Sequence, residues 1–201
     1  MLDREEVVRS LTGAWRIFLS RPDAMRFFDV SIDGFWRSFA AVVLIAPTYL
    51  LFAIAERTAI LSEPIVDPAF SDGAFFANKV VALALDWTAL PILLALVAGP
   101  LGVSRTYAPF IVARNWCAVL ATAPYFVVSL LLVIGGLSDS GATLLSLLIL
   151  VVVIRYNYMI ARRALGADIG LAVGVVVADL LISFGVLALV DGMISYRSAA
   201  L

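Results

Sequence analysis

The sequence predicts an all-α integral membrane protein, a bundle of five transmembrane helices preceded by one or two amphipathic helices. Of its 201 residues, 63% are hydrophobic and only 14% are charged, and the mean hydropathy is +1.06. Soluble domains have roughly 45–50% apolar and about 25% charged residues. In addition, five separate windows are long and apolar enough to cross a bilayer, which takes about 20 residues each.

Residues 1–35 are expected to form a separate amphipathic segment at the membrane interface. The apolar residues at helical spacing are Val7, Val8, Leu11, Trp15 and Phe18, and they lie opposite Glu5, Arg9, Thr12 and Arg16. After Ser20-Arg21-Pro22, the stretch PDAMRFFDV is compatible with a second short interfacial helix. The segment either anchors the chain at the surface or takes part in docking a partner or sensing lipid.

The transmembrane domain is expected to cover residues 36–197. Its apolar windows are roughly 37–55, 76–98, 109–134, 142–163 and 168–190. The segments between them carry the Gly, Pro and Asp residues expected of turns: SEPIVDPAFSDG, AGPLGVSRTYAP, GGLSDSG and ALGAD. No internal repeat is evident, which makes an inverted-repeat transporter less favoured than its alternatives.

Basic residues predict the orientation, because they concentrate in cytoplasmic loops. With the N-terminus inside, ten arginines are cytoplasmic: Arg4, Arg9, Arg16, Arg21, Arg26, Arg37, Arg105, Arg114, Arg162 and Arg163. Only Arg57, Lys79 and Arg197 fall on the other side. The N-terminus is therefore expected in the cytoplasm and the C-terminus in the periplasm. The near-absence of lysine is typical of a high-GC bacterial source, which indicates a bacterial inner membrane.

The composition excludes several classes of function. There is no histidine, so histidine-ligated haem and histidine general bases are ruled out. The single cysteine, Cys117, permits no intramolecular disulfide. No nucleotide-binding loop, nucleophile elbow or metal-ligand pattern occurs, so we expect neither an enzyme nor a cofactor. A net charge of −1 argues against a nucleic-acid partner.

Four ionisable residues lie inside the apolar windows, namely Asp86, Arg114, Arg155 and Asp179. Such residues are costly in lipid and usually face the bundle interior or a water-filled cavity. Arg114 lies only one or two turns into the third window, and its side chain leans toward the cytoplasmic surface. We therefore expect Arg114 to reach that surface, with Asn115 beside it at the interface.

Arg155 cannot reach a surface so easily, because its side chain leans toward the membrane midplane. Gly166 lies at the centre of the ALGAD turn between the fourth and fifth windows. Arg155 is 11 residues before it and Asp179 is 13 residues after it. At 1.5 Å per residue, their depths differ by only about 3 Å. The sequence thus predicts a buried Arg155–Asp179 pair.

Asp86 has no obvious partner in its own hairpin. Either it is hydrogen-bonded to Thr88, Thr122 or Tyr125 or joins the Arg155 network, or it is the kind of lone carboxyl that proton carriers use. Near Arg155, the polar groups Tyr156, Asn157 and Tyr158 are expected to line a small pocket with Asn115 that opens to the cytoplasm.

A stripe of small residues in the last window is expected to allow close helix packing. Its members are Gly170, Gly174, Ala178 and Gly185. The stripe faces the fourth window, another window, or a second copy of the protein.

The layout resembles the Yip family of five-span membrane proteins. It shares an N-terminal cytoplasmic amphipathic region, here LSRPDAMRFFDVSIDGFWRSF, and five spans in about 200 residues with a short exposed C-terminus. The resemblance is architectural, and no functional residue is carried over. It implies a non-enzymatic role in membrane organisation or trafficking through protein partners.

Besides an enzyme, which we do not expect, two functions are compatible with the sequence. The first, which we favour, is an adaptor or accessory subunit whose partners are the lipid bilayer and another membrane protein or a second copy. The second is a small transporter or permease in which Asp86, Arg155 and Asp179 bind an ion or solute.

Overall fold

The computed structural model describes residues 3–62 and 70–198, with side chains to Val190. All regular structure in these residues is helical, which confirms the all-α class. The elements are α1 (Arg4–Phe18), the 3-10 turn η1 (Ala24–Phe27), α2 (Ile32–Ser38), the 3-10 turn η2 (Phe39–Ala41), α3 (Val42–Leu61), α4 (Asp72–Val97), α5 (Tyr107–Val133), α6 (Asp139–Ile160), the π-helical turn η3 (Ala161–Leu165) and α7 (Ile169–Ser198). Most of the expected turn SEPIVDPAFSDG lies outside the described residues, as does the side chain of Arg197.

Five helices are long and apolar enough to span a membrane, and the chain is an integral membrane protein. The first of them runs without interruption from Ile32 to Leu61, through α2, η2 and α3. The expected boundary between residues 35 and 36 therefore falls inside a helix. In the stretch PDAMRFFDV, where a second short helix was expected, Ala24–Phe27 form the short 3-10 helix η1.

Side-chain caps explain where several of these helices begin. The Ser31 hydroxyl accepts a hydrogen bond from the Gly34 N–H (3.0 Å), and the Ser138 hydroxyl accepts one from Gly141 (3.2 Å). The Asp168 carboxylate accepts from the Leu171 N–H at 2.7 Å. Each cap satisfies a donor that the first helical turn leaves unpaired. Between α6 and α7, Gly166 adopts the left-handed φ of 67° that turns the chain back.

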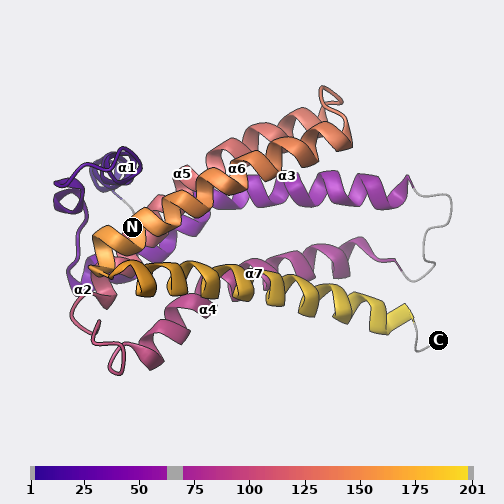
Figure 1. Ribbon diagram of the computed structural model, residues 1–201. Coiled ribbons are helices and arrows are strands. Elements are labelled where there is room, and N and C mark those ends of the chain that lie inside the picture. Colours follow the sequence, from indigo (N-terminus) through magenta and orange to yellow (C-terminus); the bar gives the residue numbers. More distant parts are fainter. Residues whose placement is uncertain (1–2, 63–69, 199–201) are drawn as a thin grey trace.

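The spanning helices form two groups that join at one end (Figure 1). Helix α5 packs against α3 and α6, whereas α4 packs mainly against α7. The two groups lie together near α1 and separate toward the opposite end, as Figure 1 shows. We call these the α1 end and the far end. The buried core is richest near the α1 end, where it includes Ile111, Trp116 and Ile160.

Helix α1 lies across the α1 end of the spanning helices, seen nearly end-on in Figure 1. Its sequence divides into three faces rather than the two expected. The face docked on the bundle is buried and consists of Glu6, Ser10, Gly13, Ala14 and Ile17. The apolar stripe beside it stays partly exposed, with Val8 at 58% and Trp15 at 52%. A charged third face includes the exposed Arg4 and Arg9. This division suits a helix that touches protein, lipid and water at once.

Polar contacts hold α1 in place. The Tyr156 hydroxyl of α6 donates to the Ala14 carbonyl at 2.6 Å. The Arg37 guanidinium bonds the buried Glu6 carboxylate (2.8 Å) and also Asp29 (2.6 Å). Hydrogen bonds from Ser31, together with the charge of Arg37, hold the pKa of Asp29 below its usual value. These contacts tie α1 and the segment after it to the first and fourth spans.

Gly34→Ala should loosen this junction. A Cβ at position 34 would lie 2.2 Å from the Asp29 carbonyl oxygen, so the backbone that carries the Arg37 pair must move. We expect a loss of about 1–3 kcal/mol, measured by thermal unfolding in detergent. Gly99→Ala is the matched control, because a Cβ there meets nothing within 4 Å in the described part of the chain. Equal effects of the two variants would contradict the prediction.

Candidate functional site

One polar network inside the membrane receives side chains from four of the five spanning helices. We call it the intramembrane network. Its members are Asp86 of α4, Arg114 of α5, Asn157 of α6, and Asp179 and Ser183 of α7. It joins α4 and α7 to the group formed by α3, α5 and α6.

The centre of the network is an ion pair between α5 and α7. The Arg114 Nη2 donates to the Asp179 Oδ1 at 2.9 Å, and the two side chains are only 14% and 18% exposed. The Asn157 Nδ2 donates to the other carboxylate oxygen at 3.3 Å. The Arg114 guanidinium also lies 6.0 Å from the centre of the Trp87 ring, a cation–π distance. Both charges are thus neutralised without solvent.

The expectation that Arg114 reaches the cytoplasmic surface is wrong. Helices α5 and α7 both begin at the α1 end, and Arg114 and Asp179 lie seven and ten residues after Tyr107 and Ile169. Their depths therefore differ by only about 4.5 Å. The Asp179 side chain leans toward the start of its helix, which brings the carboxylate toward Arg114. A charged partner at this distance stabilises the guanidinium inside the bundle.

The predicted Arg155–Asp179 pair is also wrong. Arg155 is exposed, and it makes no ion pair with a described residue. Counting residues from the turn between α6 and α7 gave the correct depth for the contact on α6, because Asn157, two residues from Arg155, contacts Asp179. It could not give the rotation of the helix, and two residues correspond to about 200° around the axis. Asn157 therefore faces α7, while Arg155 faces away from it.

Asp86 is bonded, but by none of the partners considered for it. The Ser183 hydroxyl of α7 donates to the Asp86 Oδ1 at 2.6 Å. Ser183 follows Asp179 by four residues and so lies on the same helix face. This spacing is visible in the sequence and could have identified Ser183 as a candidate partner. The proposed partners bond backbone carbonyls instead: Thr88 bonds Ala84, Thr122 bonds Ala118, and Tyr125 bonds Ser146.

The expected polar pocket near Arg155 does not form from its four members. Tyr156 bonds α1, and Asn157 belongs to the network. Asn115 is fully buried and donates to the Ser38 hydroxyl at 3.0 Å, so it does not line a pocket with the other three. Tyr158 packs against the apolar core. Consecutive residues of a helix point in different directions, and these groups serve different contacts.

The space beside the Arg114–Asp179 pair is very small. Its volume is about 10 Å³, and its lining includes Arg114, Asn157 and Asp179. A single water needs roughly 10–15 Å³ of such space. The Arg114 Nη1 is buried here without a hydrogen-bond partner in the described part of the chain. The pair can thus hold at most about one water molecule, and an organic solute does not fit.

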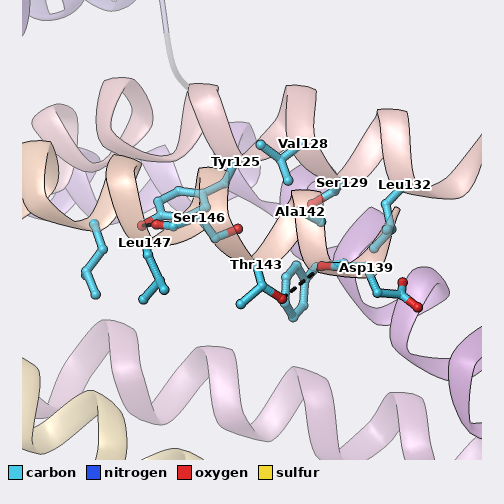
Figure 2. A pocket seen from close by; sticks show the side chains of 11 residues that line it. Tyr125, Val128, Ser129, Leu132, Asp139, Ala142, Thr143, Ser146 and Leu147 are labelled. Carbon is cyan, nitrogen blue, oxygen red and sulfur yellow. Dashed lines mark hydrogen bonds between the residues drawn. The ribbon is translucent and has the colours of Figure 1, made fainter. Parts of the chain in front are cut away.

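A larger cavity of about 390 Å³ lies between α5 and α6 (Figure 2). Tyr125, Ser129, Asp139, Thr143 and Ser146 contribute its polar groups. Thr143 donates to the Asp139 carbonyl and Tyr125 to the Ser146 carbonyl, so these hydroxyls are used by backbone groups. Tyr125 is 11 residues beyond Arg114, or about 16 Å along α5, which separates this cavity from the network. Among the residues described, no cluster suited to a metal ion occurs.

The small-residue stripe of α7 is left uncovered by the described residues. A Cβ added at Gly174 or Gly185 would meet nothing within 4 Å, and one at Gly170 only the Asp168 side chain. Ala178, the fourth member, is partly buried. The helix packs on the bundle with a different face, which includes Ala172, Val175 and Val176. Of the orientations considered from sequence, packing of the glycines against another span of this chain is not seen among the described residues.

Comparison of the chain with protein-family models, with curated proteins and with solved structures found no match. Two structural features bear on function. Hydrogen bonds and an ion pair connect α4, α5, α6 and α7 inside the membrane, and three glycines of α7 lie on a face that the described residues leave open.

Replacing either member of the central pair should destabilise the protein. Arg114→Leu or Asp179→Leu leaves one charge buried without its partner, which costs roughly 3–5 kcal/mol. The double variant removes both charges and should recover most of this loss in thermal unfolding. Arg155→Leu is the control and should have little effect, since that side chain is exposed. A double variant no more stable than the single variants would contradict the assignment.

Proposed function

We propose that the protein is a non-enzymatic accessory subunit or adaptor of a membrane complex, and that it associates laterally through α7. The observation that supports this most is the uncovered stripe of Gly170, Gly174 and Gly185. Small residues let the backbones of two transmembrane helices approach closely, and packing is the main force between helices in lipid. The partner is a transmembrane helix of another membrane protein or of a second copy.

The intramembrane network supports the same proposal. Its central charges are bonded to each other, and the space beside them has no room for a solute. A buried pair of this kind fixes which helices neighbour each other, since any other arrangement leaves a charge in lipid. We therefore assign Arg114 and Asp179 a structural role.

We further propose a bacterial inner membrane with a cytoplasmic N-terminus and a periplasmic C-terminus. The unequal distribution of arginines supports this orientation. The charged face of α1 fits the cytoplasmic surface, where anionic lipids attract basic residues. The Yip-type layout is consistent with such a role in membrane organisation, and we retain that relationship as a proposal.

Gly174→Leu should weaken the association. The new side chain stands where a second backbone would pack, and a clash of about 1–3 kcal/mol corresponds to about tenfold weaker binding. The measurement is native mass spectrometry of the gently purified protein, which also tells a second copy from a different partner.

Val173→Leu is the matched control, because Val173 is an exposed neighbour on the side of the helix. It should leave the assembly intact. Isolation of the wild-type protein as a monomer without a stoichiometric partner would count against the proposal, as would an assembly that Gly174→Leu does not change.

A second candidate function is the passage of protons or a small cation. It is favoured by the charge balance of the network, which contains Asp86 and Asp179 but only one arginine. Asp86 therefore lacks a cation of its own, and such carboxyls form proton relays in pumps and transporters.

Asp86→Asn tests this candidate in vesicles that contain the purified protein and a pH-sensitive dye. If the protein passes protons, vesicles with the wild type should acidify faster than empty ones, and Asp86→Asn should abolish the difference. Asparagine still accepts the Ser183 hydrogen bond, so folding should persist. Asp139→Asn, outside the network, serves as control. Wild-type vesicles no faster than empty ones would eliminate this function.

A further inference from the structure

An apolar groove of about 590 Å³ lies between α5 and α6 beside α1. Trp15 and Phe18 border it from α1. Trp15 is exposed, whereas Phe18 packs edge-on against the Tyr156 ring of α6. The walls of the groove include Leu120, Pro124, Val127, Leu148 and Val152. Two lining side chains have a polar group: the indole of Trp15, and Tyr156, whose hydroxyl is already bonded to the Ala14 carbonyl. The groove therefore offers an occupant mainly apolar contacts.

Arg155 is next in the chain to the groove residue Tyr156, and its place in α6 puts it beside the groove. It follows the groove residues Leu148 and Val152 by seven and three positions, which puts all three on one helix face. Its side chain is exposed and pairs with no acidic residue that the structure describes. Its neighbour Tyr156 contacts α1, so Arg155 lies at the depth of α1. An amphipathic helix of this kind lies at the boundary of headgroups and acyl chains.

We propose that this groove binds one acyl chain of an anionic phospholipid and that Arg155 binds its phosphate. The guanidinium offers paired N–H donors that match phosphate oxygens. Trp15 and Phe18 cover the chain from the side of α1. The site accounts for an exposed arginine that neither pairs inside the bundle nor reaches the end of its helix.

The dimensions favour a lipid chain over a protein helix. A helix with side chains is about 10–12 Å across and rises 5.4 Å per turn, so one turn alone occupies roughly 400–600 Å³. The groove would thus be filled by about a single turn, whereas an extended hydrocarbon chain can follow its length. The lone positive charge at the edge complements a phosphate and has no counterpart on an apolar helix.

The test titrates the delipidated protein in detergent with phosphatidylglycerol or with diacylglycerol of identical acyl chains, which lacks the phosphate, and counts bound lipids by native mass spectrometry. The wild type should bind one phosphatidylglycerol about tenfold more tightly than diacylglycerol, since only the phospholipid offers a phosphate for the charge-assisted hydrogen bonds of Arg155. Arg155→Gln should remove this preference and leave diacylglycerol binding unchanged, and Arg155→Lys should keep part of it. Arg105→Gln, at another exposed arginine, should change nothing.

A second pair of variants tests the groove itself. Ala121 lines the groove, so Ala121→Leu should fill it and weaken both lipids by about tenfold. Ala188→Leu, at an exposed position of α7, should weaken neither.

Four results would overturn the proposal. They are an unchanged lipid preference in Arg155→Gln, an equal loss in Arg105→Gln, unchanged binding in Ala121→Leu, or a change of oligomeric mass in Ala121→Leu, which would assign the groove to protein. Failure of Arg155→Gln to fold would also contradict it, because an exposed side chain with no partner in the described chain should support no fold.

Discussion

The arrangement of the five spans depends on the ion pair between Arg114 and Asp179. It joins α5, which packs against α3 and α6, to α7, which packs against α4. The apolar surfaces of a membrane protein gain little from each other over lipid, so the position of a buried charge has a large influence on which helices become neighbours. Asn157 and Trp87 contact the same pair, and the bundle is therefore fixed most firmly around this point.

The sequence predicted the fold class because apolar length and turn residues are properties of single segments. The sequence did not predict the correct ion pair, because the pairing of side chains depends on how each helix is rotated about its axis. Arg155 and Asn157 are neighbours in sequence and in depth, yet only Asn157 faces α7. The spacing of Asp179 and Ser183 on one helix face was visible in advance. The approach of Arg114 was not, because a whole span (α6 with η3) lies between the helices of Arg114 and Asp179 in the sequence.

Helix α1 shows a related limit of sequence patterns. An amphipathic helix is read as one apolar and one polar face, and α1 contains both. The face that docks on the bundle is neither, since apart from Ile17 it consists of small or polar residues such as Ser10, Gly13 and Ala14. Small side chains allow close approach, and Glu6 finds its partner in Arg37. The apolar face is thereby left for the lipid, beside the groove and Arg155.

The separation of Arg114 and Asp179 by 65 residues has a consequence for biogenesis. Chains emerge from the ribosome at about 5–20 residues per second, so Arg114 precedes its partner by roughly 3–13 s. During that interval the third span holds an arginine whose carboxylate has not been synthesised. Its side chain leans toward the start of its helix, and the nearby membrane surface can solvate it while it waits. The bundle is completed only when the fifth span inserts and withdraws Arg114 from that surface.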